Sequence, residues 1–247
     1  RSTLFPYTTP FRSGKSMKAL FSNQYWAICL GLWGFMVMMS TVSGTIATYY
    51  CKYVLQNQDL YSLIYAAELI AQCVVVLIVP KLIPKFGKRN LTMYGIFLVV
   101  IAQIVWMMGP VSVAVAVASA IIRGIGVAPL WACIFPMIAD SAEFGQWKTH
   151  VRQESLIFAG GSIGTKVGAG LASAAMTGLL TFAGYVTSSS GVATQSQETL
   201  NMIINIYKFG PIIIALLAFV TLALYKLDKM YPDIMKELTE REARGEL

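Results

Sequence analysis

Lys166 is a charged residue inside a long apolar stretch, about eleven residues into the run at 155–186. At about 1.5 Å of rise per helical residue, its amine is expected near the middle of a bilayer. A cation at that depth costs about 2.5–3.5 kcal/mol on insertion scales, and such residues usually mark a transport pathway or an ion pair. The sequence leaves two roles open for Lys166: a site for substrate or coupling, or a structural lysine that snorkels or forms a salt bridge.

Three glycines around this lysine recur every four residues, at Gly160, Gly164 and Gly168. This spacing lays a smooth face along one side of a helix, because residues four apart share a face. Such a face allows close approach to the helix backbone. Either another helix or a ligand is expected to occupy it.

A second deep cation, Arg123, lies at a depth similar to that of Lys166, and Glu68 is the deep acid available to neutralise it. Two cations on adjacent spans repel each other unless acids or an anion balance them. One interpretation is a structural clamp between Arg123 and Glu68. The other is an anionic substrate, such as a uronide, gripped by the guanidinium.

The residues after Arg123 favour a site in the same span. Gly124, Gly126 and Pro129 permit a kink and close helix packing, because neighbouring groups can satisfy the freed backbone. Trp131 follows about two turns beyond Arg123. Its ring is either a packing residue or a surface for the C–H face of a sugar.

Motifs for catalysis and metal binding are absent from the sequence. It contains no HExxH, GxSxG or P-loop pattern, and its single histidine, His150, has no neighbouring histidine or cysteine. The cysteines form no ligand spacing and are expected to be packing residues; they are Cys29, Cys51, Cys73 and Cys133. We therefore predict no enzyme activity, no cofactor and no metal site in this chain.

Composition identifies an integral membrane protein. The chain is 56% hydrophobic and 13% charged with a mean hydropathy of +0.63, whereas soluble domains carry about 25% charged residues. The net charge of +7 is gathered in short connections, so it indicates membrane orientation and contact with lipid rather than nucleic-acid binding.

Six apolar runs are long enough to span a bilayer, which predicts an all-α membrane domain over 14–225. The runs are 26–50, 61–83, 91–108, 111–138, 155–186 and 203–224. Lysine and arginine concentrate in every second connection, beginning with the segment at 81–89. By the positive-inside rule, both ends of the chain are expected to be cytoplasmic, in a multi-pass protein of the inner (cell) membrane.

The two ends of the chain differ from this pattern. Residues 226–247 are predicted to form a solvated cytoplasmic tail helix, opened by Pro232 and supported by Glu237 and Arg241 at i,i+4. Residues 1–13, RSTLFPYTTPFRS, resemble the translation of a ligated sequencing adapter and are excluded from the fold prediction. We expect the natural N-terminus to lie elsewhere, and the chain to be the rear part of a longer protein.

The connection after the fourth run, MIADSAEFGQWKTHVRQES, strongly resembles the corresponding loop of the glycoside–pentoside–hexuronide:cation symporters, the melibiose permease family of the major facilitator superfamily. The family pattern is Ala-Asp, an acid three residues on, Gly-Glu-aromatic-Lys and an Arg; Gln146 stands in place of the usual Glu. Further similar segments lie at 48–54, at 81–89, from Lys166 to Tyr185, and in the tail.

This resemblance covers nearly all of residues 18–247 and implies the C-terminal six-helix half of a twelve-helix carrier. It implies that Lys166 is the family's lysine near the sugar and cation sites, and that Trp131 is the cavity tryptophan. The polar positions just before the family's lysine correspond here to Gly161 and Ser162, so Ser162 is a further candidate for substrate binding.

The resemblance also implies a cytoplasmic gate, in which Asp140, Glu143 and Arg152 form ion pairs with the other half that open and close during transport. Arg123 has no counterpart in the family pattern, so the charge of the substrate stays open.

We therefore expect the C-terminal part of a secondary active transporter for a glycoside, pentoside or hexuronide, driven by Na⁺ or H⁺ and working by alternating access. Its main partners are the sugar, lipid and the N-terminal six-helix half, where the family's cation-binding acids lie. The alternative is a non-transporting six-span scaffold or receptor, whose glycine-rich face serves helix pairing.

Overall fold

In the computed structural model, residues 18, 20–150, 154–187 and 194–245 are described, and the ordered elements among them are helices. Their bounds are α2 Gln24–Tyr49, η1 Tyr50–Val54 (a π-helical turn that continues α2), α3 Leu60–Phe86, α4 Lys88–Met108, α5 Val113–Thr149, α6 Glu154–Phe182, α7 Gln197–Ala223 and α8 Leu227–Ala243. The predicted adapter segment at 1–13 lies outside the described residues.

Polar residues set several of these helix ends. The side chains of Asn23, Ser112 and Ser196 accept hydrogen bonds from backbone N–H groups in the first turns of α2, α5 and α7. Gly87 separates α3 from α4 at φ +78°, a conformation that glycine adopts without strain. The chain can therefore reverse direction within one residue at that end of the bundle.

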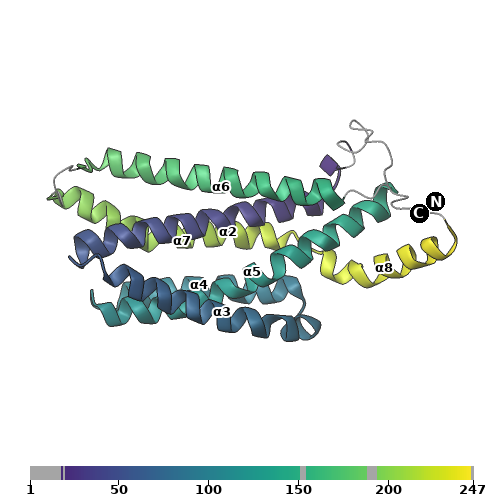
Figure 1. Cartoon of the computed structure of the whole chain (residues 1–247), viewed down its shortest axis with the longest axis horizontal. Coiled ribbons are helices and arrows are strands. Elements are labelled where there is room, and N and C mark those ends of the chain that lie inside the picture. Colours follow the sequence, from purple (N-terminus) through teal and green to yellow (C-terminus); the bar gives the residue numbers. More distant parts are fainter. Residues whose placement is uncertain (1–17, 19, 151–153, 188–193, 246–247) are drawn as a thin grey trace, which may run out of the picture.

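Six helices, α2 to α7, run up and down along the long axis of the molecule (Figure 1). α6 lies along one side, α2 and α7 occupy the middle, and α3, α4 and α5 form the other side, with α8 beyond the end of the bundle. Five of the six are long and apolar enough to cross a membrane. The sixth, α6, has 29 residues and carries Lys166 near its middle.

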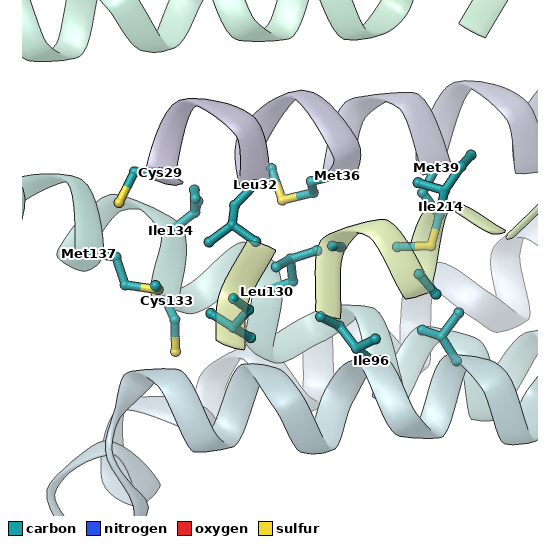
Figure 2. Close-up of a cluster of buried hydrophobic side chains, with 14 of the residues drawn as sticks. Cys29, Leu32, Met36, Met39, Ile96, Leu130, Cys133, Ile134, Met137 and Ile214 are labelled. Atoms are coloured by element: carbon teal, nitrogen blue, oxygen red, sulfur yellow. The ribbon is translucent and has the colours of Figure 1, made fainter. Parts of the chain in front are cut away.

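The core lies between α2, α5 and α7 (Figure 2). Leu32 and Met36 of α2 pack with Leu130 and Ile134 of α5, and all four are almost completely buried. Large apolar side chains are also exposed on the outside of the bundle; among them are Leu77, Met108, Phe182 and Val220. Apolar exposure on this scale suits lipid rather than water.

Close backbone contact brings α4 and α5 together. A Cβ atom added to Gly95 would lie 2.3 Å from the carbonyl oxygen of Gly126. The expected close packing at Gly126 is therefore present, and α5 continues as one helix through Pro129 and Pro136.

Several predicted helix ends differ from the structure; α7, for example, begins at Gln197 rather than at 203. The segment after the fourth run was expected to be a loop, but α5 continues to Thr149, because Asp140, Ser141 and Phe144 are buried against neighbouring helices. The tail helix, Leu227–Ala243, lies within the predicted range 226–247, but Pro232 is inside it rather than at its start, because Leu227 is fully buried and belongs to the core.

Candidate functional site

A cavity of about 260 Å³ opens between α2, α3 and α5. Each helix contributes one face. On α3 the lining residues Tyr61, Tyr65, Glu68 and Gln72 follow the i, i+4, i+7, i+11 spacing of a single helical face. The other lining residues are Met36, Met39, Ser40, Ser43, Gly44 and Ala47 of α2, Ile64 and Leu69 of α3, and Arg123, Val127 and Trp131 of α5.

An ion pair joins α3 to α5 in this cavity. The Nε atom of Arg123 donates to Oε1 of Glu68 at 2.9 Å, and Nη2 donates to Oε2 at 2.5 Å. The Arg123 side chain is 2% exposed and that of Glu68 is 17% exposed, so the carboxylate is the more accessible partner. The pairing expected of a structural clamp is therefore present, and it lies in the wall of a cavity.

Glycine makes this pairing possible. Gly124, next to Arg123, lies directly against the backbone of Glu68, so α3 and α5 approach closely at the ion pair. Counted from the start of each helix, Glu68 lies eight residues into α3 and Arg123 ten residues into α5. These offsets correspond to depths of about 12–15 Å, close to the middle of a bilayer.

Other groups in the cavity suit a polar, ring-shaped ligand. The hydroxyl oxygen of Ser43 is buried and has no hydrogen-bond partner among the described residues. Trp131 is half-buried, and Tyr61 and Tyr65 stack at a centroid distance of 5.7 Å. Aromatic walls with a few polar groups are typical of small-molecule sites.

Lys166 and Ser162 do not line this cavity. Both are exposed on α6, and Lys166 has no ion-pair partner among the residues that the structure describes. The glycine face of α6 packs against α2, where a Cβ atom at Gly168 would lie 2.3 Å from the carbonyl oxygen of Gly34. A helix rather than a ligand therefore occupies that face. Lys166, about 200° around from Gly164, lies on the opposite side of α6.

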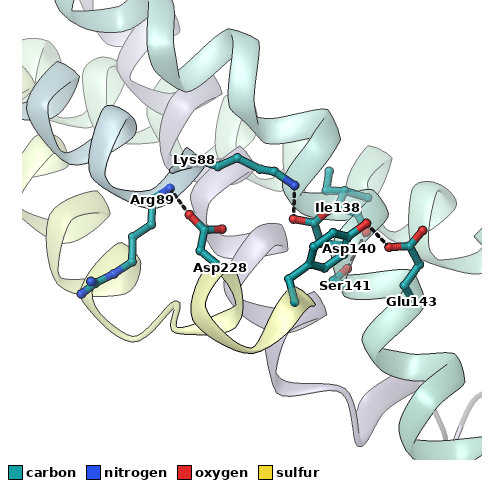
Figure 3. Close-up of polar contacts among 8 residues, drawn as sticks. Lys88, Arg89, Ile138, Asp140, Ser141, Glu143 and Asp228 are labelled. Atoms are coloured by element: carbon teal, nitrogen blue, oxygen red, sulfur yellow. Dashed lines mark hydrogen bonds and ion pairs between the residues drawn. The ribbon is translucent and has the colours of Figure 1, made fainter. Parts of the chain in front are cut away.

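The predicted gate residues Asp140 and Glu143 lie in a polar cluster where α4, α5 and α8 meet (Figure 3). Asp140 accepts a hydrogen bond from Lys88, whose amine lies 4.9 Å from the ring centroid of Tyr231. The Tyr231 hydroxyl donates to Glu143. Arg152 lies outside the described residues.

A second set of contacts holds α8 on the bundle. The backbone N–H of Arg89 donates to Asp228 at 2.8 Å. The indole N–H of Trp147 donates to Glu237 at 2.6 Å, and Glu237 also pairs with Arg241. The hydrogen bond from Trp147 has the largest effect in lowering the pKa of Glu237, and the hydrogen bond from Arg241 lowers it further. The tail helix is therefore docked along its buried side rather than fully solvated.

Sequence reasoning missed part of both sites. It singled out Trp131, Arg123 and Glu68, but not the tyrosines of α3, Gln72, or the serines of α2 that complete the cavity. The spacing of Tyr61, Tyr65, Glu68 and Gln72 on one helical face was a readable signal. No comparable signal in the sequence predicted the contact of Asp228 with Arg89 of α4, because these two residues are 139 positions apart.

Residues 5–229 match the family described as "MFS/sugar transport protein", and the chain belongs to that family. It is 29% identical over 231 residues to the isoprimeverose transporter of Lactiplantibacillus pentosus, covering 93% of this chain and 47% of the relative. It is 27% identical over 223 residues to the glucuronide carrier protein homolog of Escherichia coli K12, covering 87% of this chain and 47% of that relative.

The chain thus spans about half the length of these relatives. Together with the apolar helices, the family match identifies a multi-pass membrane protein of the transporter class, as the resemblance of its motifs predicted.

Proposed function

We propose that this chain forms the second six-helix half of a secondary active sugar transporter of the inner membrane, with both chain ends cytoplasmic. Na⁺ or H⁺ entry drives uptake, and the two halves move about a site at mid-depth by alternating access. The observation that carries the proposal is the cavity in which the Arg123–Glu68 pair, the half-buried Trp131 and the unpartnered hydroxyl of Ser43 meet.

In this proposal the cavity binds the sugar. Glu68 accepts hydrogen bonds from its hydroxyls, Ser43 accepts or donates them, and Trp131 covers one face of its ring. Lys166 and Ser162, on the side of α6 that is unpacked in the described part of the chain, face the other half or the substrate. Asp140, Glu143 and Arg152 act at the cytoplasmic end, where pairs between the two halves open and close during transport, whereas the Asp140–Lys88 pair lies within this half.

Transport by the complete carrier that contains this chain tests the proposal. Purified carrier in proteoliposomes is given labelled methyl pentosides and methyl hexosides under an inward Na⁺ gradient at constant pH, or under a pH gradient without Na⁺. We expect accumulation above equilibrium under one of the two gradients. Vesicles with the exposed Cys73 of α3 changed to Ser serve as the matched control and should behave like the wild type.

Two results would contradict the proposal. No more uptake than in protein-free vesicles under both gradients, with the carrier folded and oriented, argues for the scaffold alternative, whereas equilibration without accumulation would contradict coupling to Na⁺ or H⁺. Accumulation by vesicles that hold only residues 18–247 would show that no second half is required.

A further inference from the structure

The cavity that is proposed to bind sugar has a balanced charge. Arg123 and Glu68 are the oppositely charged residues that line it, and together they contribute no net charge. The remaining lining residues in the described part of the chain are apolar or uncharged polar. We infer that the substrate is an uncharged sugar or glycoside rather than a uronic acid, an inference that rests on the proposed role of this cavity.

The state of Arg123 is the first support for this inference. Two of its N–H groups, on Nε and Nη2, already bind the two oxygens of Glu68 side by side. This is the geometry in which a guanidinium would otherwise bind the carboxylate of a substrate. An anionic sugar therefore has to displace Glu68 from a buried ion pair, leaving that carboxylate without its partner.

The exposure of the two partners is the second support. The Glu68 side chain is 17% exposed and the Arg123 side chain 2%, so a ligand in the cavity meets the carboxylate before it meets the guanidinium. A carboxylate repels an anion and accepts hydrogen bonds from hydroxyl groups. An uncharged polyol gains these bonds without breaking the pair.

The remaining polar groups of the cavity also suit hydroxyls. The buried hydroxyl of Ser43 has no partner among the described residues, and Gln72 lies one turn beyond Glu68 on the same face. A hydroxyl and an amide can each both donate and accept, which matches the hydroxyls of a sugar ring. The exposed cation Lys166 lies on α6 and is not among the residues that line this cavity.

Matched sugar pairs test the inference on the complete carrier. The probes are methyl β-D-glucopyranoside against methyl β-D-glucuronide, and methyl β-D-galactopyranoside against methyl β-D-galacturonide, with methyl β-D-xylopyranoside as a further neutral probe. Binding is measured by calorimetry at pH 7. In whichever matched pair the carrier binds, we expect the neutral glycoside to bind at least about tenfold tighter than its uronide, a ratio equivalent to about 1.4 kcal/mol.

Equal or tighter binding of a uronide than of its neutral counterpart overturns the inference while leaving the proposed function intact. If no probe is bound or accumulated, the proposed function is wrong and the inference fails with it.

A charge variant tests the cause. Glu68→Gln keeps the size of the side chain and leaves Arg123 positive in the cavity, so the ratio of the two affinities should shift toward the uronide by at least about tenfold. The double variant Glu68→Gln/Arg123→Gln restores zero net charge and should keep the neutral preference. A folded Glu68→Gln carrier with an unchanged ratio contradicts the charge argument. If Glu68→Gln does not fold, the matched sugar pairs measured on the wild type and on the double variant still test the inference.

Discussion

Gly124 of α5 lies against the backbone of Glu68 of α3, so that a Cβ atom at position 124 would be 2.2 Å from the carbonyl oxygen of Glu68. A real Cβ atom cannot occupy that distance, and the obstacle is backbone rather than a flexible side chain. The side chain of the neighbouring residue, Arg123, reaches the carboxylate of the same glutamate. The close approach of the two backbones thus brings the guanidinium of Arg123 within hydrogen-bond distance of the Glu68 carboxylate.

Gly124→Ala is expected to separate α3 from α5 and to weaken both stability and sugar binding. Overpacking of this kind costs about 1–3 kcal/mol. Thermal unfolding of the complete carrier in detergent measures the effect. Gly170→Ala is the matched control, because a Cβ atom at 170 meets nothing within 4 Å. Equal unfolding midpoints for the two variants would show that the helices can separate freely at Gly124.

Lys166→Ala is expected to abolish concentrative uptake and to leave membrane insertion intact. Removal of a charge from the middle of a span makes insertion easier by up to about 2.5–3.5 kcal/mol. Uptake in proteoliposomes and the amount of carrier in the membrane are measured together, with Ser173→Ala on the same helix as the control. A Lys166→Ala carrier that accumulates sugar normally would return this lysine to a structural role.

Asp140→Asn is expected to destabilise the carrier by about 3 kcal/mol or more, because it leaves the largely buried amine of Lys88 without its carboxylate. The exchanged pair Lys88→Asp/Asp140→Lys should recover part of this loss. Denaturant unfolding of the single and exchanged variants provides the comparison. No recovery in the exchanged pair, together with no loss in the single variant, would mean that the ion pair contributes nothing.

Charge reversal at Arg152 is expected to shift the carrier toward the inward-open state, if this residue closes the cytoplasmic gate. Labelling of a cysteine placed in the cytoplasmic cavity reports the shift, and it should become faster in Arg152→Glu. Arg152→Lys retains the charge and is the control. Unchanged labelling in Arg152→Glu would remove this residue from the gate.

Acid is expected to loosen the docking of α8. The hydrogen bonds from Trp147 and Arg241 lower the pKa of Glu237, so the stabilisation from this carboxylate is present above its ordinary value, about 4.3, and is lost as the pH falls through its lowered value. Hydrogen exchange of the α8 amides is measured between pH 3 and 6 and divided by the intrinsic exchange rate, which itself slows toward pH 3; the resulting protection should fall toward low pH. In Glu237→Gln the protection should depend less on pH, whereas Glu240→Gln should resemble the wild type.

Apolar run length and charge placement predicted the six helices of the bundle to within a few residues at most of their ends. They failed at Thr149, where α5 continues through a charged segment. The amino-acid composition of a short segment does not reveal that Asp140 and Phe144 are covered by other helices. The same limit applies to Pro232, which lies inside α8 rather than at its start, because Leu227 is buried by contacts with distant parts of the chain.

The candidate site was predictable where a single helix carries the signal. The depth and spacing of Arg123 and Trp131 follow from one span, and Glu68 followed as the available acid. The different surroundings of Arg123 and Lys166 could not be predicted from the sequence. Both are deep cations in sequence, but one faces a cavity shared by three helices and the other lies on the side of α6 away from α2. Only the packing of helices against one another distinguishes them.

The seam between α2 and α6 has a mechanical consequence. At Gly34 and Gly168 the two helices meet backbone to backbone. Helices that interdigitate must lift ridges out of grooves before they slide, whereas smooth glycine surfaces shift past each other with little steric resistance. The indoles of Trp26 and Trp33 lie against Gly160 and Gly161, and we expect them to set the axial register of α6. Trimming these two indoles should let the whole helix slip lengthwise and change the height at which Lys166 lies in the membrane.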